Sequence, residues 1–102
     1  MNIIDKALSN LPGHWYQGGL GDDNGNFCGI GHILYATPYE GSADNAINLM
    51  SEVAKEQYSE RIDPDNRHTC KFAQFNDHPD TTEAEVIAVM EKASVRLDER
   101  ID

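Results

Sequence analysis

The sequence predicts a mainly α fold, with four to five helices around one core and a short β-hairpin or irregular loop near residues 14–27. Two long segments, from Ser42 to about Arg61 and from Thr81 or Thr82 to about Arg100, carry apolar residues three or four positions apart. That spacing is typical of helices that face a core. The length of 102 residues and the apolar fraction of 39% indicate a single domain over residues 1–102.

The first helix is expected over about residues 2–10. Asn2 is a good N-cap residue, and Pro12-Gly13 ends the helix because proline has no amide donor and glycine tolerates positive φ. The apolar stripe consists of Ile3, Ile4, Ala7, Leu8 and Leu11.

Residues 14–27 have the weakest helical pattern. Asn24-Gly25 favours a turn, so a short β-hairpin or an irregular loop is expected there. A buried helix of about two turns is expected to follow, and Thr37-Pro38 stops it. We expect Trp15 to be partly buried against the last helix and Gln17 to bond to the backbone.

The clearest helix runs from Ser42, a good cap residue, to about Arg61. Asp63-Pro64 then breaks the chain, and residues 68–75 are expected to form another short helix. The core stripe of the long helix is Ala43, Ala46, Ile47, Met50, Val53, Ala54 and Tyr58.

The final helix begins at Thr81 or Thr82. Thr82 and Glu85 fit a capping box, in which a hydroxyl and a carboxylate each bond to the other's free backbone amide. Residues 76–81 are expected to form the loop that enters this helix. Its core stripe is Val86, Val89, Met90, Ala93 and Leu97.

The charge of the chain is its most unusual property. Eighteen acidic residues against eight basic ones give a net charge of −10, which disfavours direct binding to nucleic acid and to anionic membranes. The acidic residues spread over several elements, so they belong to a folded surface. The interaction candidates are the row Glu52, Glu56 and Glu60, spaced four apart on the long helix, and the turn residues Asp22 and Asp23.

The sequence contains no secretory signal pattern and no apolar run as long as a membrane span. A cytoplasmic location in a bacterial host is therefore expected. Cys28 and Cys70 could pair, although two cysteines without an export signal are more often free thiols.

Four residues form a weak candidate set for zinc: Cys28, His32, His68 and Cys70. Their spacing matches no known zinc finger, so we expect neither a metal nor another cofactor. A thiol enzyme is the second catalytic hypothesis. In it, Cys28 would be activated in the first turn of a helix by one of four histidines, with Asn76 or Asp77 orienting the base.

Three short motifs resemble those of a known family. Trp15-Tyr16-Gln17-Gly18 fits W-x-Q-G, Cys28 to Gly31 fits C-x-x-G, and Asn76 to Thr81 fits N-D-x-P-x-T. The chain resembles, over about residues 3–98, a family of small uncharacterised proteins from actinobacteria and their phages. It departs from that family at Phe75, where the family usually has Trp, and at Gly31 in the small-residue run. The resemblance implies an intracellular, phage-related accessory protein and assigns no catalytic residue.

These observations predict a non-enzymatic accessory protein that binds a host or phage protein with a basic surface. A nucleic-acid mimic that inhibits a DNA- or RNA-binding protein is one alternative. A small zinc- or thiol-dependent enzyme is another, and a homodimer packed through the long helices is possible.

Overall fold

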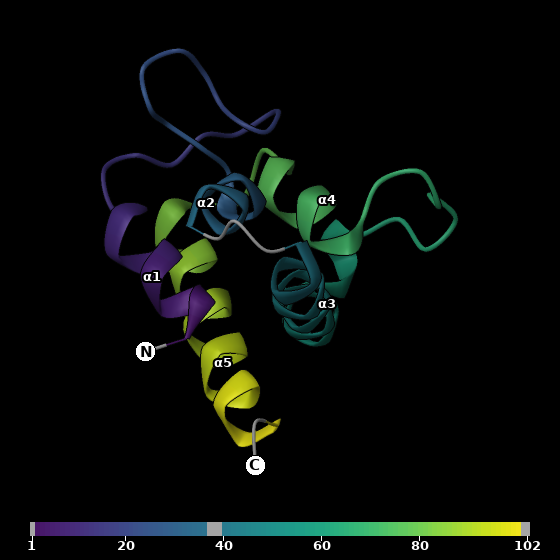
Figure 1. The fold of residues 1–102 in the computed structure, drawn as a ribbon. Coiled ribbons are helices and arrows are strands. Elements are labelled where there is room, and N and C mark those ends of the chain that lie inside the picture. Colours follow the sequence, from purple (N-terminus) through teal and green to yellow (C-terminus); the bar gives the residue numbers. More distant parts are fainter. Residues whose placement is uncertain (1, 37–39, 101–102) are drawn as a thin grey trace.

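The computed structural model describes residues 2–36 and 40–100, and within them it is a bundle of helices without a strand (Figure 1). The mainly α prediction is therefore confirmed. The elements in chain order are α1 (Ile3–Asn10), α2 (Gly29–Ala36), α3 (Glu40–Gln57), the short 3-10 helix η1 (Ser59–Arg61), α4 (Lys71–Asp77) and α5 (Glu83–Arg100).

The helices pack in two groups that meet directly along α3 and α5. In Figure 1, α1 lies against α5 on one side, and α3 lies beside α4 on the other. The short helix α2 contacts α1, α3 and α4, so it closes one end of the bundle. Two long loops project from this frame, the first between α1 and α2 and the second between η1 and α4 (Figure 1).

The core is built from the predicted stripes. Phe72 and Phe75 of α4 are its largest fully buried side chains, and their rings meet edge to face with centroids 5.8 Å apart. All the predicted stripe residues of α5 are buried except Leu97, which is partly buried. The other fully buried large side chains include Ile4, Leu11, Ile33, Leu49, Met50, Val53, Val86, Val89 and Met90.

The N-terminal helix forms as predicted. Asn2 caps α1 in a capping box, because its side chain accepts from the amide of Asp5 while the Asp5 carboxylate accepts from the amide of Asn2. The amide group of Asn2 also donates to the carbonyl and hydroxyl oxygens of Ser94 and to Asp98 on α5. The cap thereby ties the two ends of the described chain together.

Residues 12–28, which we call the 12–28 loop, form an irregular excursion rather than a β-hairpin. Two isolated bridges, from Phe27 to Trp15 and to Gly21, are its only β-type pairings in the described chain. Gly25 has φ +84°, the left-handed conformation that the Asn24-Gly25 turn requires. The sequence allowed either a short β-hairpin or an irregular loop here, and the structure shows the irregular loop.

The long central helix differs from its predicted bounds. It begins at Glu40, before Ser42, so Ser42 lies inside the helix and is not its first cap. It ends at Gln57, and residues 59–61 continue as the separate turn η1. The predicted helix stop at Thr37-Pro38 lies outside the described residues, although α2 does end at Ala36.

The last two helices have side-chain caps. Cys70 caps α4, because its sulfur accepts from the amide of Ala73, so this helix begins three residues later than predicted. The predicted capping box of α5 is confirmed: the Thr82 hydroxyl accepts from the Glu85 amide, and the Glu85 carboxylate accepts from the Thr82 amide.

Candidate binding face

The 12–28 loop is held on the bundle by one buried side chain, Asn76 of α4, which is fully inaccessible to solvent. Its Oδ1 accepts from the indole Nε1 of Trp15 at 2.8 Å and from the amide of Gly29 at 3.2 Å. Its Nδ2 donates to the carbonyl of Tyr16 at 3.1 Å. Asn76 therefore joins α4, the 12–28 loop and the start of α2.

Neighbouring residues complete this attachment. The Gln17 amide donates to the carbonyls of His78 and Thr81, as predicted for a backbone contact. The amide of Gly18 donates to the Asp77 carboxylate at 2.9 Å. Trp15 is partly buried as expected, and its indole donates to Asn76 of α4. The three sequence motifs therefore meet at one structural junction.

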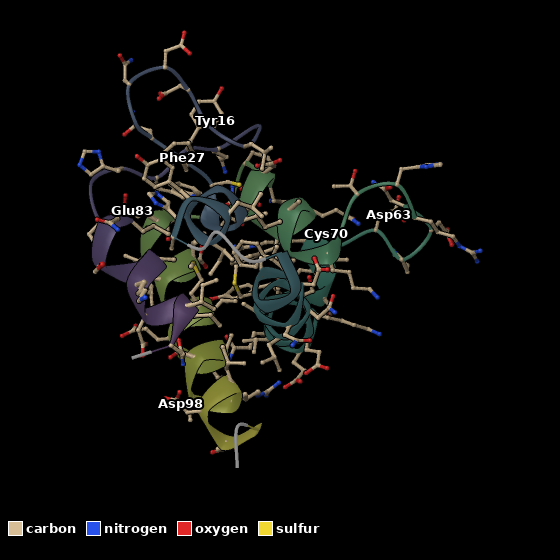
Figure 2. The ribbon with its side chains drawn as sticks, in the orientation of Figure 1. Tyr16, Phe27, Asp63, Cys70, Glu83 and Asp98 are labelled. Carbon is tan, nitrogen blue, oxygen red and sulfur yellow. The ribbon has the colours of Figure 1, made fainter. Side chains whose placement is uncertain are left out.

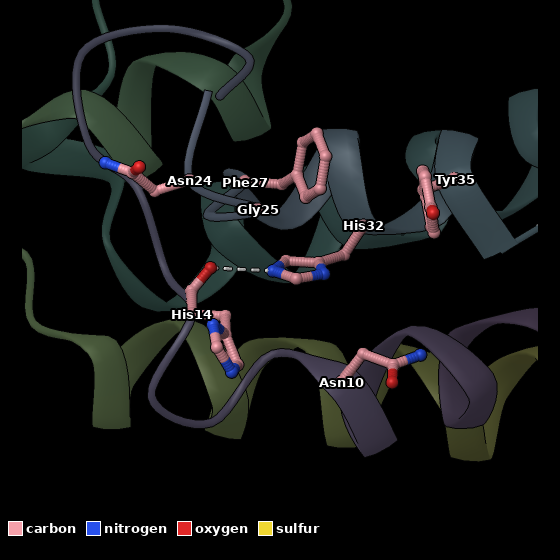
Figure 3. Close-up of a pocket in the computed structure, with 7 residues that line it drawn as sticks. All are labelled: Asn10, His14, Asn24, Gly25, Phe27, His32 and Tyr35. Carbon is pink, nitrogen blue, oxygen red and sulfur yellow. Dashed lines mark hydrogen bonds between the residues drawn. The ribbon is translucent and has the colours of Figure 1, made fainter. Parts of the chain in front are cut away.

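The fixed loop, α2 and the end of α1 line an open surface pocket of about 250 Å³ (Figure 3). Its wall contains two imidazoles, from His14 in the loop and His32 in α2, and the rings of Phe27 and Tyr35. These two aromatic rings stack with centroids 5.4 Å apart and an interplanar angle of 26°. Asn10, Asn24 and Gly25 complete the lining.

His32 presents a hydrogen-bond acceptor to this pocket. The residue is only 4% exposed, and its Nε2 lies 2.9 Å from the carbonyl oxygen of His14 (Figure 3). Because a carbonyl oxygen only accepts, Nε2 carries the proton. Burial lowers the pKa of His32 below its ordinary value of 6.5. The ring is therefore neutral at pH 7, and Nδ1, which has no hydrogen-bond partner in the described structure, is an unprotonated acceptor.

An apolar patch adjoins the pocket. Leu20 of the loop and Leu34 and Tyr35 of α2 are 59%, 47% and 79% exposed, and together with Phe27 and Gly31 they line a second hollow of about 290 Å³. Among the described residues, the fourth large hydrophobic side chain with comparable exposure is Val95 on α5. We call the pocket and the patch together the α2 face.

Acidic groups border the α2 face. The carboxylate of Asp22 accepts from the backbone amides of Asn24 and Asn26 and from the Asn26 side chain. These hydrogen bonds lower the pKa of Asp22 below its ordinary value of 3.8, so it is ionised at pH 7. Asn24 lines the pocket and Asn26 bonds to His14 at 3.3 Å, so the charge of Asp22 lies at the pocket rim. Asp23 is exposed beside it.

The predicted acidic row Glu52, Glu56 and Glu60 does not form one helical face. Helix α3 ends at Gln57, which places Glu60 in η1. Glu56 is bound by the guanidinium of Arg96 through two contacts, at 2.7 and 2.8 Å, and Arg96 also lies 4.0 Å from Glu52. Glu60 lies 3.9 Å from Arg61. Arg96 thus offsets part of this charge, whereas Arg61 is bound more closely by Glu85, at 3.0 Å, than by Glu60.

The weak zinc candidates do not form a metal-binding cluster. The part of the chain that the structure describes contains no group of three or more His, Cys, Asp or Glu side chains able to hold a metal ion. Cys28, just before α2, and His32, within it, are buried, whereas His68 and Cys70 are exposed in the segment before α4. Figure 2 shows Cys70 at the end of the projecting loop. Both cysteines are free thiols, so they do not pair.

Cys28 precedes α2, and its sulfur accepts from the amide of Gly31 at 3.3 Å. The expectation that a helix start lowers its pKa is wrong here. Burial raises the pKa of Cys28 more than the hydrogen bonds from Gly31 and Ile30 lower it. Its thiol therefore stays protonated at pH 7, which does not suit a nucleophile.

Sequence reasoning missed the residues that build the α2 face. Leu20, Leu34 and Tyr35 read as core or loop residues, and Asn76 as a local loop bond. One available signal was the resemblance itself, because W-x-Q-G and N-D-x-P are motifs whose polar members reach each other across 60 residues.

Fold and face together describe a small helical domain with a fixed loop, a surface pocket and an adjoining apolar patch. The chain belongs to the family of unknown function DUF6197, whose model matches residues 2–96 and so spans all the helices except the end of α5. No curated protein and no solved structure matches it. No helix among the described residues is long and apolar enough to cross a membrane.

Proposed function

We propose that this protein acts by binding another protein through the α2 face. The observation that carries the proposal is the clustering of exposed apolar side chains: Leu20, Leu34 and Tyr35 lie together beside a preformed pocket. Scattered exposed hydrophobic residues are normal on a soluble protein, but a contiguous patch with a polar rim is typical of interaction surfaces.

Charge complementarity selects a basic partner. The chain has a net charge of −10, and Asp22 and Asp23 border the face. Lysine and arginine residues that flank the docked segment would lie near these carboxylates and speed association. Two copies of this chain would instead bring two large negative charges together, which argues against a homodimer through this face.

The pocket specifies the anchor of that partner. An aromatic side chain with an N–H or O–H group, from tryptophan or tyrosine, would pack on the rings of Phe27 and Tyr35 and donate to Nδ1 of His32. Leu20 and Leu34 would cover the neighbouring apolar part of the segment. The partner is thus a basic segment with an aromatic anchor.

The biological setting is part of the same proposal. The W-x-Q-G, C-x-x-G and N-D-x-P-x-T motifs support a phage-related accessory protein that binds a host or phage protein in the bacterial cytoplasm. A nucleic-acid mimic draws less support, because Arg96 engages Glu56 in the acidic row on which such mimicry would depend.

Selection from a library of displayed random peptides tests the proposal. We expect the wild-type protein to enrich peptides that combine Trp or Tyr with flanking Lys or Arg. A Leu34→Gln/Tyr35→Ala variant should not enrich them, whereas Val95→Gln, which removes an equally exposed apolar group from α5, should. Enrichment of the same peptides by the double variant would contradict the proposal, and so would the failure of the wild type to enrich any.

A further inference from the structure

A separate cavity, also of about 290 Å³, lies away from the α2 face, where α3, η1 and α4 meet. Four successive segments supply its wall: Lys55 comes from α3, Ser59 from η1, Ile62 and Pro64 from the following loop, and Lys71 from the start of α4. Figure 2 shows this loop, with Asp63 on it and Cys70 at its end, projecting from the bundle. None of these residues belongs to the α2 face.

The two lysines have no partner of their own. Within the described chain, neither ammonium group makes an ion pair or a hydrogen bond, although acidic residues outnumber basic ones by more than two to one. By contrast, Arg61 is bound by Glu85 and Arg96 by Glu56. Two of the four lysines in the sequence therefore line this one cavity without an ion pair inside the described chain.

Two of the nearby carboxylates make hydrogen bonds to other groups. Glu56, which follows Lys55 in the sequence, is held by Arg96, and the Asp63 carboxylate accepts from the amide of Asp65 at 2.9 Å. Ile62 is 8% exposed and, with Pro64, provides the apolar part of the wall. The hydroxyl of Ser59 is a further hydrogen-bond donor in the wall.

We propose that this cavity binds a small organic anion, namely a carboxylate or phosphate on a compact apolar group. Lys55 and Lys71 would hold the oxyanion from two sides by charge-assisted hydrogen bonds, with Ser59 as a third donor. Ile62 and Pro64 would receive the apolar part. The cavity is at the lower end of the size of small-molecule sites, about 300 Å³, so the ligand must be compact.

Two-dimensional NMR titration at constant ionic strength tests this site, with benzoate, phenyl phosphate, inorganic phosphate and the neutral analogue benzamide as probes. We expect benzoate and phenyl phosphate to shift the signals of Ser59, Ile62 and the two lysines, with benzamide and inorganic phosphate binding more weakly. Preference between benzoate and phenyl phosphate then identifies which oxyanion the site favours.

Charge-removing variants complete the test. Lys55→Gln and Lys71→Gln should each weaken binding about tenfold, as expected for loss of one hydrogen bond to a charged group. Lys6→Gln, which removes the same charge from an exposed position on α1, should leave binding unchanged. Both cavity lysines are exposed, so the variants should fold, and thermal unfolding checks this. Equal binding of benzamide and benzoate, or equal weakening by Lys6→Gln, would overturn the proposal.

Discussion

At the scale of single residues, Asn76 uses both the donor and the acceptor groups of its side-chain amide to hold the 12–28 loop on the bundle. A primary amide offers two donors and an acceptor oxygen, and the structure uses both kinds of group on residues that are distant in sequence. Because the side chain is fully buried, each lost bond would leave a partner without a replacement. The position of the 12–28 loop, and with it the α2 face, depends on this residue.

Asn76→Ala should therefore destabilise the protein strongly. It leaves the indole of Trp15 and the amide of Gly29 without their acceptor, which predicts a loss of about 2–4 kcal/mol in the free energy of unfolding. Urea denaturation followed by circular dichroism measures this. Asn24→Ala, at an exposed loop position, serves as the control and should change stability by less than about 0.5 kcal/mol. Equal, small effects of the two substitutions would contradict the role of Asn76.

The pH dependence of stability should report His32. The pKa of His32 in the folded state lies below the ordinary value of 6.5. Between these two pKa values, His32 is protonated in the unfolded chain but neutral in the folded chain. The contribution of His32 to stability is thus complete above about pH 6.5 and is lost as the pH falls from there toward the lowered folded pKa. The carboxylates with lowered pKa, such as Glu85, act in a separate window below about pH 4.5.

Chemical denaturation at several pH values between about 7.5 and 5.5 measures this effect. We expect the free energy of unfolding of the wild type to fall across the interval and His32→Gln to flatten the fall. His68→Gln, at an exposed histidine, should leave the slope of the wild type intact. A wild-type slope that persists in His32→Gln would show that another group is responsible.

The two thiols should differ in reactivity. Cys28 is 4% exposed and its pKa is raised, whereas Cys70 is exposed. Alkylation by iodoacetamide under native conditions, followed by peptide mass spectrometry, should modify Cys70 fast and Cys28 only slowly. In denaturant the two rates should converge. Fast native labelling of Cys28 would be inconsistent with its burial and would revive the thiol-enzyme hypothesis.

At the scale of elements, the sequence predicted correctly those features of a helix that depend only on residues near one another in the chain. The Asn2 cap, the capping box at Thr82 and the apolar stripe of α5 depend on neighbours within one or two turns, and the structure confirms them. The end of α3 at Gln57 was missed because the apolar spacing continues to Tyr58, whose ring stacks on Phe75 at 4.8 Å after the helix has ended. The side chain of Tyr58 thus packs on the core although it lies beyond the end of the helix.

The α2 face was beyond local reasoning for a different reason. Whether Leu34 and Tyr35 face the core or the solvent depends on where the 12–28 loop lies, and that is decided by Asn76, some 40 residues later. The mixture of glycine, aromatic and apolar residues in α2 fits either orientation.

The close approach of the loop to α2 gives a prediction for glycine. A Cβ at Gly31 would lie 2.5 Å from the carbonyl oxygen of Leu20 and 2.9 Å from Cβ of Phe27. Gly31→Ala should therefore push the loop away from α2 and cost about 1–3 kcal/mol of stability in urea denaturation. Gly19→Ala is the control, since its Cβ would make one ordinary contact of 3.5 Å with the Tyr16 ring. A neutral Gly31→Ala would mean that the loop does not pack there.

At the scale of the whole molecule, the negative charge is unevenly compensated. Arg61 binds Glu85 of α5, and Arg96 binds Glu56 of α3. The second ion pair reduces the free negative charge of the acidic row that the sequence suggested as an interaction surface. Such partly exposed pairs contribute little individually to stability. The charge at Asp22 and Asp23 instead borders an apolar surface, so the α2 face combines the two properties that a basic, aromatic segment would recognise.

The most direct test is the dissociation constant of a selected basic peptide with an aromatic anchor, measured by calorimetry at low and high salt for three proteins. We expect affinity for the wild type to fall between about 50 and 500 mM salt, Val95→Gln to match the wild type, and Leu34→Gln to bind at least about tenfold more weakly. Binding that survives high salt and is weakened equally by Val95→Gln and Leu34→Gln would contradict recognition through the α2 face.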